Sequence, residues 1–289
     1  MNKAADIGSP SGNAPGMRAI KFNRDWITRP LYGAALAAIT VAAIFGGALY
    51  VSILAGAVGI AAAREWHRMI TDRALGLDFF VTSATIIVAL LVALESPHSV
   101  WPWLAVAAGS LAAALLARSR SEPLLWQAAG AIYLCVPMLA LLLLRDAPHG
   151  AMIIIALFIA IWTTDTGALI IGNLVGGPRL WPSLSPNKTW SGTLGGVVAA
   201  AMAEAAFVLL VGGHASTGII LGGGISIVAH CGDLFESWVK RVFQRKDSGS
   251  MIPGHGGVLD RIDSTLAAAP CLAALVLIAG INPLLGVHS

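Results

Sequence analysis

The chain has 289 residues, of which 57% are hydrophobic and only 11% are charged, and its mean hydropathy is +0.79. A soluble globular domain is not this apolar, and repeated runs of about 20 apolar residues indicate membrane-spanning helices. The formal net charge of +3 says little as a total. The three cysteines, Cys135, Cys231 and Cys271, are scattered without a Cys-x-x-Cys spacing, which argues against a disulfide framework and a zinc site.

The N-terminal segment 1–29 differs in composition from the rest of the chain. It is rich in Gly, Pro, Ser and Asn, carries five basic residues, and lacks the apolar stretch of a signal peptide. We therefore expect a disordered, basic cytosolic arm whose charges orient the protein in the membrane rather than bind nucleic acid. Residues 30–289 are expected to form one membrane-embedded domain.

Apolar runs predict an all-α, polytopic membrane protein with nine spans. The spans are expected at 31–47, 48–63, 78–95, 100–117, 125–144, 151–174, 191–213, 215–231 and 265–285. A single helix over 31–63 would extend about 50 Å, against about 30 Å for the hydrocarbon core of a bilayer. We therefore expect a break at Gly46-Gly47.

The distribution of basic residues favours nine spans and a cytoplasmic N-terminus. With that topology, every Lys and Arg except Arg145 lies on the inner side, whereas merging the first two spans divides the basic residues between the two sides. The charged motifs would then face the cytoplasm, where nucleotides are found.

Two acidic residues lie deep inside predicted spans, where a charge costs about 2.5–3.5 kcal/mol at the helix centre. Asp165 lies among threonines in the segment 161–172, close to Gly167. We expect it to form the wall of a polar cavity that contacts a substrate or an ion; the alternative is a structural hydrogen bond to a neighbouring helix. Glu204 lies among alanines, and we assign it no role.

The segment 185–196, SPNKTWSGTLGG, resembles an anion-binding loop. Lys188 offers a cation, Ser185 and Thr189 offer hydroxyls, and Gly192 begins the next helix, whose N-terminal amides favour an anion. The signal is weak by itself, because helix-capping residues beside a lysine that reaches for the interface would look the same.

The segment from Ser237 to Asp263 concentrates charge between glycines at positions 249, 254, 256 and 257. Its titratable residues are Lys240, Arg241, Arg245, Lys246, Asp247, His255, Asp260, Arg261 and Asp263. Cations, carboxylates and a flexible glycine loop are the groups that bind phosphates and their metal ions.

The spacing within this cluster predicts a site between two helix ends. If the eighth helix continues past residue 232, then Asp233, Glu236 or Ser237, and Lys240 share one face. Asp260 begins the last helix. Two acids that flank a glycine loop suit Mg²⁺, which keeps water and substrate phosphates as its other ligands. The alternative is a solvated charge cluster that orients two helices, which would explain the cations but not the glycines or the histidine.

The charged segment contains the pattern Ser237-x-x-Lys240-Arg241-x4-Lys246-Asp247-x-Gly249-x-x-Ile252-Pro253-x-His255-Gly256-Gly257-Val258-x-Asp260-Arg261-x-Asp263. This pattern resembles the signature of the phosphatidate cytidylyltransferases, also called CDP-diacylglycerol synthases. Asp165-Thr166-Gly167-Ala168 and Ser185-Pro186-x-Lys188-Thr189 are similar to two further motifs of that family, as are Arg29 and the ARE-W sequence at 63–66. Leu169 departs from the pattern, because an aromatic residue is usual there. The resemblance extends roughly from residue 29 to residue 270.

This resemblance implies an enzyme that condenses CTP with phosphatidic acid, giving CDP-diacylglycerol and pyrophosphate, with Mg²⁺ as the cofactor. It also implies a homodimer in a bacterial-type inner membrane, with a polar cavity that faces the cytoplasm. By position, a two-cation site would fall on Asp233 and Asp260, and a monovalent ion could be the second cation.

The remaining expected roles follow from the chemistry of phosphates. A phosphate monoester is mostly a dianion at neutral pH, so no strong general base is required. The residues expected to help the metal site or neutralise phosphates are Asp263, Asp247, Lys240, Arg241, Lys246 and Arg261. The residues expected to contact substrate are Asp165, Ser185, Lys188, Thr189, Ser237, Gly254, Gly256 and Gly257. We expect His255 to orient a phosphate rather than to abstract a proton.

Two other functions remain open from the sequence. A CTP-dependent kinase of a polyprenol-type lipid would use the same groups but transfer the γ-phosphate. A transporter with a cytosolic anion site would need paired inverted halves or charges across the bilayer, neither of which is visible in the sequence.

Overall fold

The structure is a computed structural model, and it describes residues 25–249, 251, 256–278, 280–284 and 287–288. The described residues contain nine α-helices and four short strands. The helices are α1 (Asp25–Gly46), α2 (Ala48–Thr71), α3 (Leu77–Glu95), α4 (Trp101–Ser119), α5 (Leu124–Asp146), α6 (Gly150–Val175), α7 (Trp190–Leu210), α8 (Ala215–Val242) and α9 (Leu259–Leu277). The all-α class is therefore confirmed.

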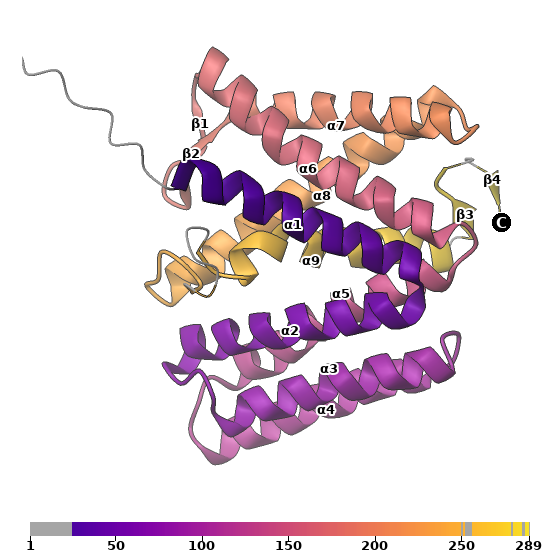
Figure 1. Ribbon diagram of the computed structural model, residues 1–289. Coiled ribbons are helices and arrows are strands. Elements are labelled where there is room, and N and C mark those ends of the chain that lie inside the picture. Colours follow the sequence, from indigo (N-terminus) through magenta and orange to yellow (C-terminus); the bar gives the residue numbers. More distant parts are fainter. Residues whose placement is uncertain (1–24, 250, 252–255, 279, 285–286, 289) are drawn as a thin grey trace, which may run out of the picture.

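The helices form two groups around a shared centre. Figure 1 shows α2, α3 and α4 along one side and α6 and α7 along the opposite side, with α5, α8 and α9 between them. α5 packs on both groups because its apolar residues point in opposite directions: Leu139 and Leu142 join the core with α2 and α3, whereas Leu141 and Leu144 join the core with α6.

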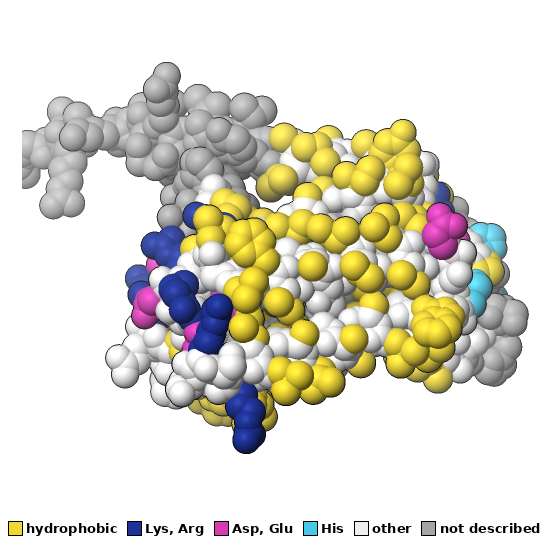
Figure 2. Space-filling model, turned by 90° about the horizontal axis from the view of Figure 1, so that it is seen from below, with side chains coloured by type: hydrophobic (Ala, Val, Ile, Leu, Met, Phe, Trp, Pro, Cys, Tyr) yellow, Lys and Arg dark blue, Asp and Glu magenta, His cyan; other side chains and the backbone are white. Residues whose placement is uncertain are grey.

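Seven helices, α2 to α8, are long and apolar enough to cross a membrane. Within the described residues, the apolar part of α1 covers only Gly33–Gly46, and α9 is not among the seven. The protein is thus a polytopic membrane protein, while nine spans and a cytoplasmic N-terminus stay predictions. On the face shown in Figure 2, hydrophobic side chains cover the middle of the molecule, and most Lys and Arg gather at one end.

The expected break between the first two spans is confirmed. α1 ends at Gly46, and α2 begins at Ala48. Gly47, between them, has a φ of 110°, a conformation that glycine adopts at no steric cost. α1 begins at Asp25, within the range 1–29 that we expected to be a disordered arm, and residues 1–24 lie outside the described residues.

Other helix ends differ from the expected spans. α8 continues to Val242 rather than ending at residue 231, because its charged residues continue the helix past the apolar run. α9 ends at Leu277 rather than at 285. After it, Gly280 has a φ of 61°, and Ile281–Asn282 (β3) pairs with Val287–His288 (β4).

The segment expected to be an anion-binding loop is partly a strand. Ser185–Thr189 (β2) pairs antiparallel with Arg179–Trp181 (β1), and α7 begins directly after it. The hairpin lies between α6 and α7, so it carries Lys188 to the end of the molecule where α8 also ends.

Candidate functional site

Asp233 lies on α8 and forms an ion pair with Lys188 of β2. The side chains of Asp233 and Lys188 are 29% and 23% exposed, so the pair is partly shielded from solvent. One turn further along α8, the Ser237 hydroxyl lies 3.5 Å from Asp233 Oδ1. The structure therefore brings together three predicted site residues from two segments that are 45 positions apart at their closest.

Asp260, at the start of α9, accepts hydrogen bonds from three donors. Lys240 Nζ of α8 lies 2.7 Å from Oδ1, and the backbone amides of Ser248 and Gly257 each lie 3.2 Å from Oδ2. Burial raises the pKa of the Asp260 carboxyl, but the hydrogen bonds from its neighbours and the positive charge of Lys240 together outweigh burial, and the pKa falls to about 2. Asp260 is therefore an ionised carboxylate at neutral pH.

Glu236 completes the predicted face of α8. Its Oε1 lies 3.1 Å from Lys240 Nζ, at the i, i+4 spacing of one helix face. The side chain is fully buried, and apart from this ion pair its carboxylate oxygens have no hydrogen-bond partner among the described residues. Lys240 therefore lies between two carboxylates, Glu236 and Asp260.

Asp263 lies one turn after Asp260 on α9 and interacts electrostatically with the acids on α6 and α8. Burial raises the pKa of its carboxyl above the ordinary value, and the carboxylates of Asp233 and Asp165 raise it further, while Lys188 opposes them. Asp165 thus belongs to the same cluster, although its side chain on α6 is exposed at the surface of the chain.

The cluster contains more acids than bases, which fits a divalent cation. Its acids are Asp165, Asp233, Glu236, Asp260 and Asp263, and its bases are Lys188, Lys240 and Arg261. Among the described residues, no three His, Cys, Asp or Glu side chains converge closely enough to form a metal site by themselves. Mg²⁺ is commonly held by one or two carboxylates together with water and phosphates, so the donor set suits that ion without a complete protein cage.

The predicted cations outside this cluster, Arg241 and Lys246, are exposed, and so are Asp247 and the cluster's own Arg261. These side chains are accessible to a ligand in solution. His255 and Gly254 lie outside the described residues.

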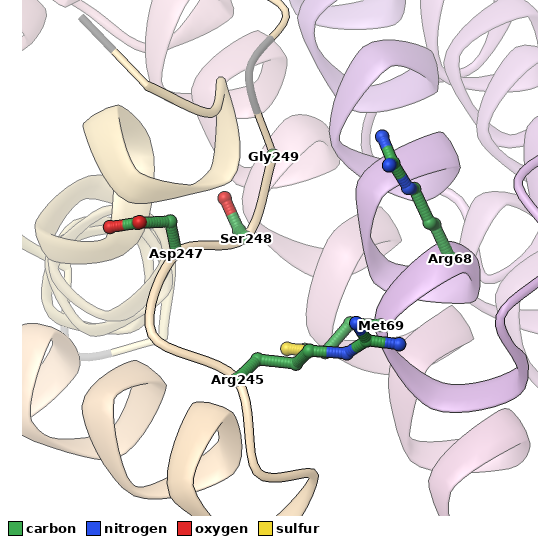
Figure 3. Close-up of a pocket in the computed structure, with 6 residues that line it drawn as sticks. All are labelled: Arg68, Met69, Arg245, Asp247, Ser248 and Gly249. Atoms are coloured by element: carbon green, nitrogen blue, oxygen red, sulfur yellow. The ribbon is translucent and has the colours of Figure 1, made fainter.

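A cavity of about 190 Å³ opens beside the cluster, between the C-terminal half of α2 and the segment after α8. It is lined by Arg68, Met69, Arg245, Asp247, Ser248 and Gly249. In Figure 3, Arg245 reaches across toward α2, Arg68 extends along that helix, and Asp247 points away from it. Arg245 also pairs with Asp72 at the end of α2.

Two predicted substrate contacts have structural roles in this geometry. Thr189 is the N-cap of α7, because its hydroxyl accepts a hydrogen bond of 3.1 Å from the Gly192 amide. This is the helix-capping alternative that the sequence left open. Ser185 begins β2 opposite Trp181, and its side chain is half-buried.

Glycine is favoured at positions 256 and 257 for different structural reasons. Gly256 has a φ of 83°, which favours glycine. Gly257 lacks room for a side chain, since a Cβ would lie 2.0 Å from Ser248 Oγ and 2.6 Å from Glu65 Oε2. The close approach at Gly257 is therefore to protein atoms.

Sequence reasoning missed two residues beside the site. Glu65 of α2 was noted only as part of a motif, although an acid near the end of an apolar helix could have indicated a buried role. His230 is buried on α8, one turn before Asp233, and its Nε2 has no hydrogen-bond partner among the described residues. Glu204 is buried as well, and neither of its oxygens has such a partner there.

Comparison with known proteins covers most of the chain. Residues 27–279 match the cytidylyltransferase family. The phosphatidate cytidylyltransferase of Brucella suis biovar 1 (strain 1330) is 38% identical over 248 residues, which cover 85% of this chain and 91% of that protein, and the protein of that name from Brucella melitensis biotype 1 matches to the same extent. The Staphylococcus aureus (strain COL) protein of that name is 40% identical over 131 residues, which cover 45% of this chain and 50% of that protein.

Proposed function

The chain belongs to the cytidylyltransferase family, and on that premise we propose that it transfers the cytidylyl group of CTP to phosphatidic acid. The products are CDP-diacylglycerol, a precursor in phospholipid biosynthesis, and pyrophosphate. The observation that carries the proposal is the cluster at the charged end of the helices, where Asp233 pairs with Lys188 and Asp260 pairs with Lys240. The names of the similar proteins support the same reaction.

The reaction joins two anions, so the barrier is mainly electrostatic. A phosphate oxygen of phosphatidic acid forms a bond to the α-phosphorus of CTP, and the bond from that phosphorus to the bridging oxygen of the β-phosphate breaks. The electron pair leaves with pyrophosphate. Because the nucleophile is a phosphate monoester with a second pKa near 6, no side chain has to remove a proton from it at neutral pH.

We assign the carboxylates Asp233 and Asp260 to hold Mg²⁺, with Asp263 as a further acid nearby. When bound, the ion would supply charge neutralisation at the triphosphate and the leaving pyrophosphate. The lysines Lys188 and Lys240, each of which pairs with one of these carboxylates, would bind phosphate oxygens beside the ion.

The exposed cations extend the positive charge of the site toward the solution. Arg241, Lys246 and Arg261 attract the nucleotide, and Arg68 and Arg245 add positive charge at the cavity beside Ser248. We propose that this cavity admits the phosphates of CTP. The lipid substrate keeps its acyl chains in the bilayer and presents only its headgroup to the cluster.

We further propose that the protein is a homodimer in a bacterial-type inner membrane, with its site facing the cytoplasm. The gathering of basic residues at one end of the molecule supports this orientation through the positive-inside rule (Figure 2). The family resemblance supports the dimer.

The reaction is tested with purified protein, phosphatidic acid, Mg²⁺ and CTP labelled at either the α- or the γ-phosphate. We expect α-label in the lipid product and release of the γ-label with pyrophosphate. Transfer of γ-label to a lipid alcohol would replace the proposal with a lipid kinase, and no transfer of either label would reject both enzymes.

A further inference from the structure

We infer that Glu65 is a positioning residue for this reaction, because its carboxylate holds together the two ends of the segment that carries the glycine loop. Glu65 lies near the C-terminal end of α2 and is 2% exposed. One oxygen, Oε2, accepts hydrogen bonds from the Ser248 hydroxyl at 3.1 Å and from the Leu259 amide at 2.9 Å. The inference rests on the proposed function, since that function gives the loop its chemistry.

The same two ends also hold Asp260. The Ser248 amide and the Gly257 amide each donate to Asp260 Oδ2 at 3.2 Å. Glu65 therefore binds the residue that begins the loop and the residue directly before Asp260. Through these contacts, α2 sets the position of a carboxylate that we assign to Mg²⁺.

The glycines beside Glu65 support this close fit. A Cβ at Gly249 would lie 2.4 Å from Glu65 Oε1, and one at Gly257 would lie 2.6 Å from Glu65 Oε2. Figure 3 shows Ser248 and Gly249 on the segment that faces α2, the helix that carries Arg68. Glycine at positions 249 and 257 therefore allows the chain to approach the carboxylate.

A role in packing alone does not explain an acid at this position. An apolar side chain of similar size would fill the space without the cost of burying a charge. Only an acceptor can bind the Ser248 hydroxyl and the Leu259 amide at once. Because one oxygen accepts both bonds, the amide of glutamine can supply the same acceptor, whereas leucine cannot.

The experiment compares Glu65→Leu and Glu65→Gln in the purified full chain. Hydrogen exchange of peptides over 248–260 is measured without substrate, and kcat and KM are measured with CTP and phosphatidic acid. Glu65→Leu should speed exchange in this segment and lower kcat roughly 10- to 100-fold, as for other residues that orient a metal ligand, with an unchanged KM for phosphatidic acid. Glu65→Gln should keep the exchange rate of the unchanged protein and most of its activity.

Ser248→Ala provides a second variant that leaves α2 intact, and it should speed exchange in the same segment with a smaller loss of kcat. Glu204→Gln, which alters a buried acid of α7, is the control and should change neither quantity. The inference would be overturned if hydrogen exchange in 248–260 were no faster in Glu65→Leu and Ser248→Ala than in the unchanged protein. A Glu65→Gln protein as impaired as Glu65→Leu would also overturn it, because that result assigns the role to the charge.

The two readouts separate this inference from the proposed function. If Glu65→Leu speeds exchange but the unchanged protein forms no CDP-lipid, the positioning contact is supported and the proposed reaction is rejected. Normal CDP-lipid formation with unaltered exchange would reject the contact alone.

Discussion

At the scale of single residues, each of the two acids that we assign to the metal pairs with a lysine. Lys188 pairs with Asp233 and Lys240 pairs with Asp260. Such pairs hold cations beside the carboxylates, where we propose that the substrate phosphates bind. Removing one carboxylate should therefore disturb binding of the ion more than the fold.

We expect Asp260→Asn to lower CDP-lipid formation by more than about 100-fold while the protein stays folded in detergent. Asparagine keeps the shape of the side chain but loses the charge that would hold Mg²⁺. Asp146→Asn, at the end of α5, is the matched control because Asp146 is partly exposed and pairs only with His98 among the contacts described. Near-normal activity of Asp260→Asn would remove Asp260 from the metal role.

His255 tests whether an enzymic base is needed. We expect His255→Gln to lower activity without moving the pH profile upward, because the phosphate nucleophile is already ionised at neutral pH. The measurement is the pH dependence of kcat/KM for both proteins. An upward shift that hydroxide restores would instead assign a proton transfer to His255.

The cavity between α2 and the segment after α8 gives a third prediction at this scale. Arg68→Gln should raise KM for CTP and leave KM for phosphatidic acid unchanged, because the arginine lines the cavity that we assign to the phosphates of CTP. Steady-state kinetics with each substrate varied in turn provides the comparison. An equal rise in both KM values would contradict a role specific to the nucleotide.

At the scale of elements, the β1–β2 hairpin determines where Lys188 lies. β2 runs directly into α7, and Thr189 at the junction caps that helix. The cap satisfies a backbone amide at the helix start and so fixes the direction in which the strand enters the helix. Lys188, one residue earlier, is placed by the same junction.

The cap can be tested separately from substrate binding. Thr189→Ala should lower the stability of the purified protein by about 1 kcal/mol, and Thr189→Asn, which provides another good N-cap, should recover most of it. Thermal unfolding in detergent measures both. Unchanged stability of Thr189→Ala together with a raised KM would show that the hydroxyl contacts substrate instead.

At the scale of the whole molecule, the site gathers segments from both groups of helices. Asp165 and Lys188 come from the side of α6 and α7, Glu65 comes from α2, and Asp260 lies at the start of α9 between them. On the face shown in Figure 2, most Lys and Arg gather at one end of the molecule, while apolar side chains cover the middle. We therefore propose that the reaction takes place at the membrane boundary.

The orientation predicts which loops a membrane-impermeant reagent can reach. In a background without the three native cysteines, His98→Cys should be labelled in intact cells, whereas Ser121→Cys should be labelled only after the membrane is opened. The two residues lie at opposite ends of α4, outside its bounds. The reverse pattern would place the site outside the cytoplasm.

The amino-acid sequence alone determined the membrane class, the approximate course of each helix and the concentration of charge near residues 233–263. Those properties are local, since apolar runs and helical spacing do not depend on which segments meet. It also indicated the shared face of Asp233, Glu236 and Lys240, which holds because α8 continues to Val242.

Only the tertiary structure decided which groups contact one another. The capping role of Thr189 and the pairing of each lysine with its acid follow from how the hairpin, α8 and α9 meet. Glu65 and the Leu259 amide are 194 positions apart, so no local pattern reveals their hydrogen bond. A contact of this kind depends on the packing of α2 against the start of α9, which arises from the cores of both helix groups together.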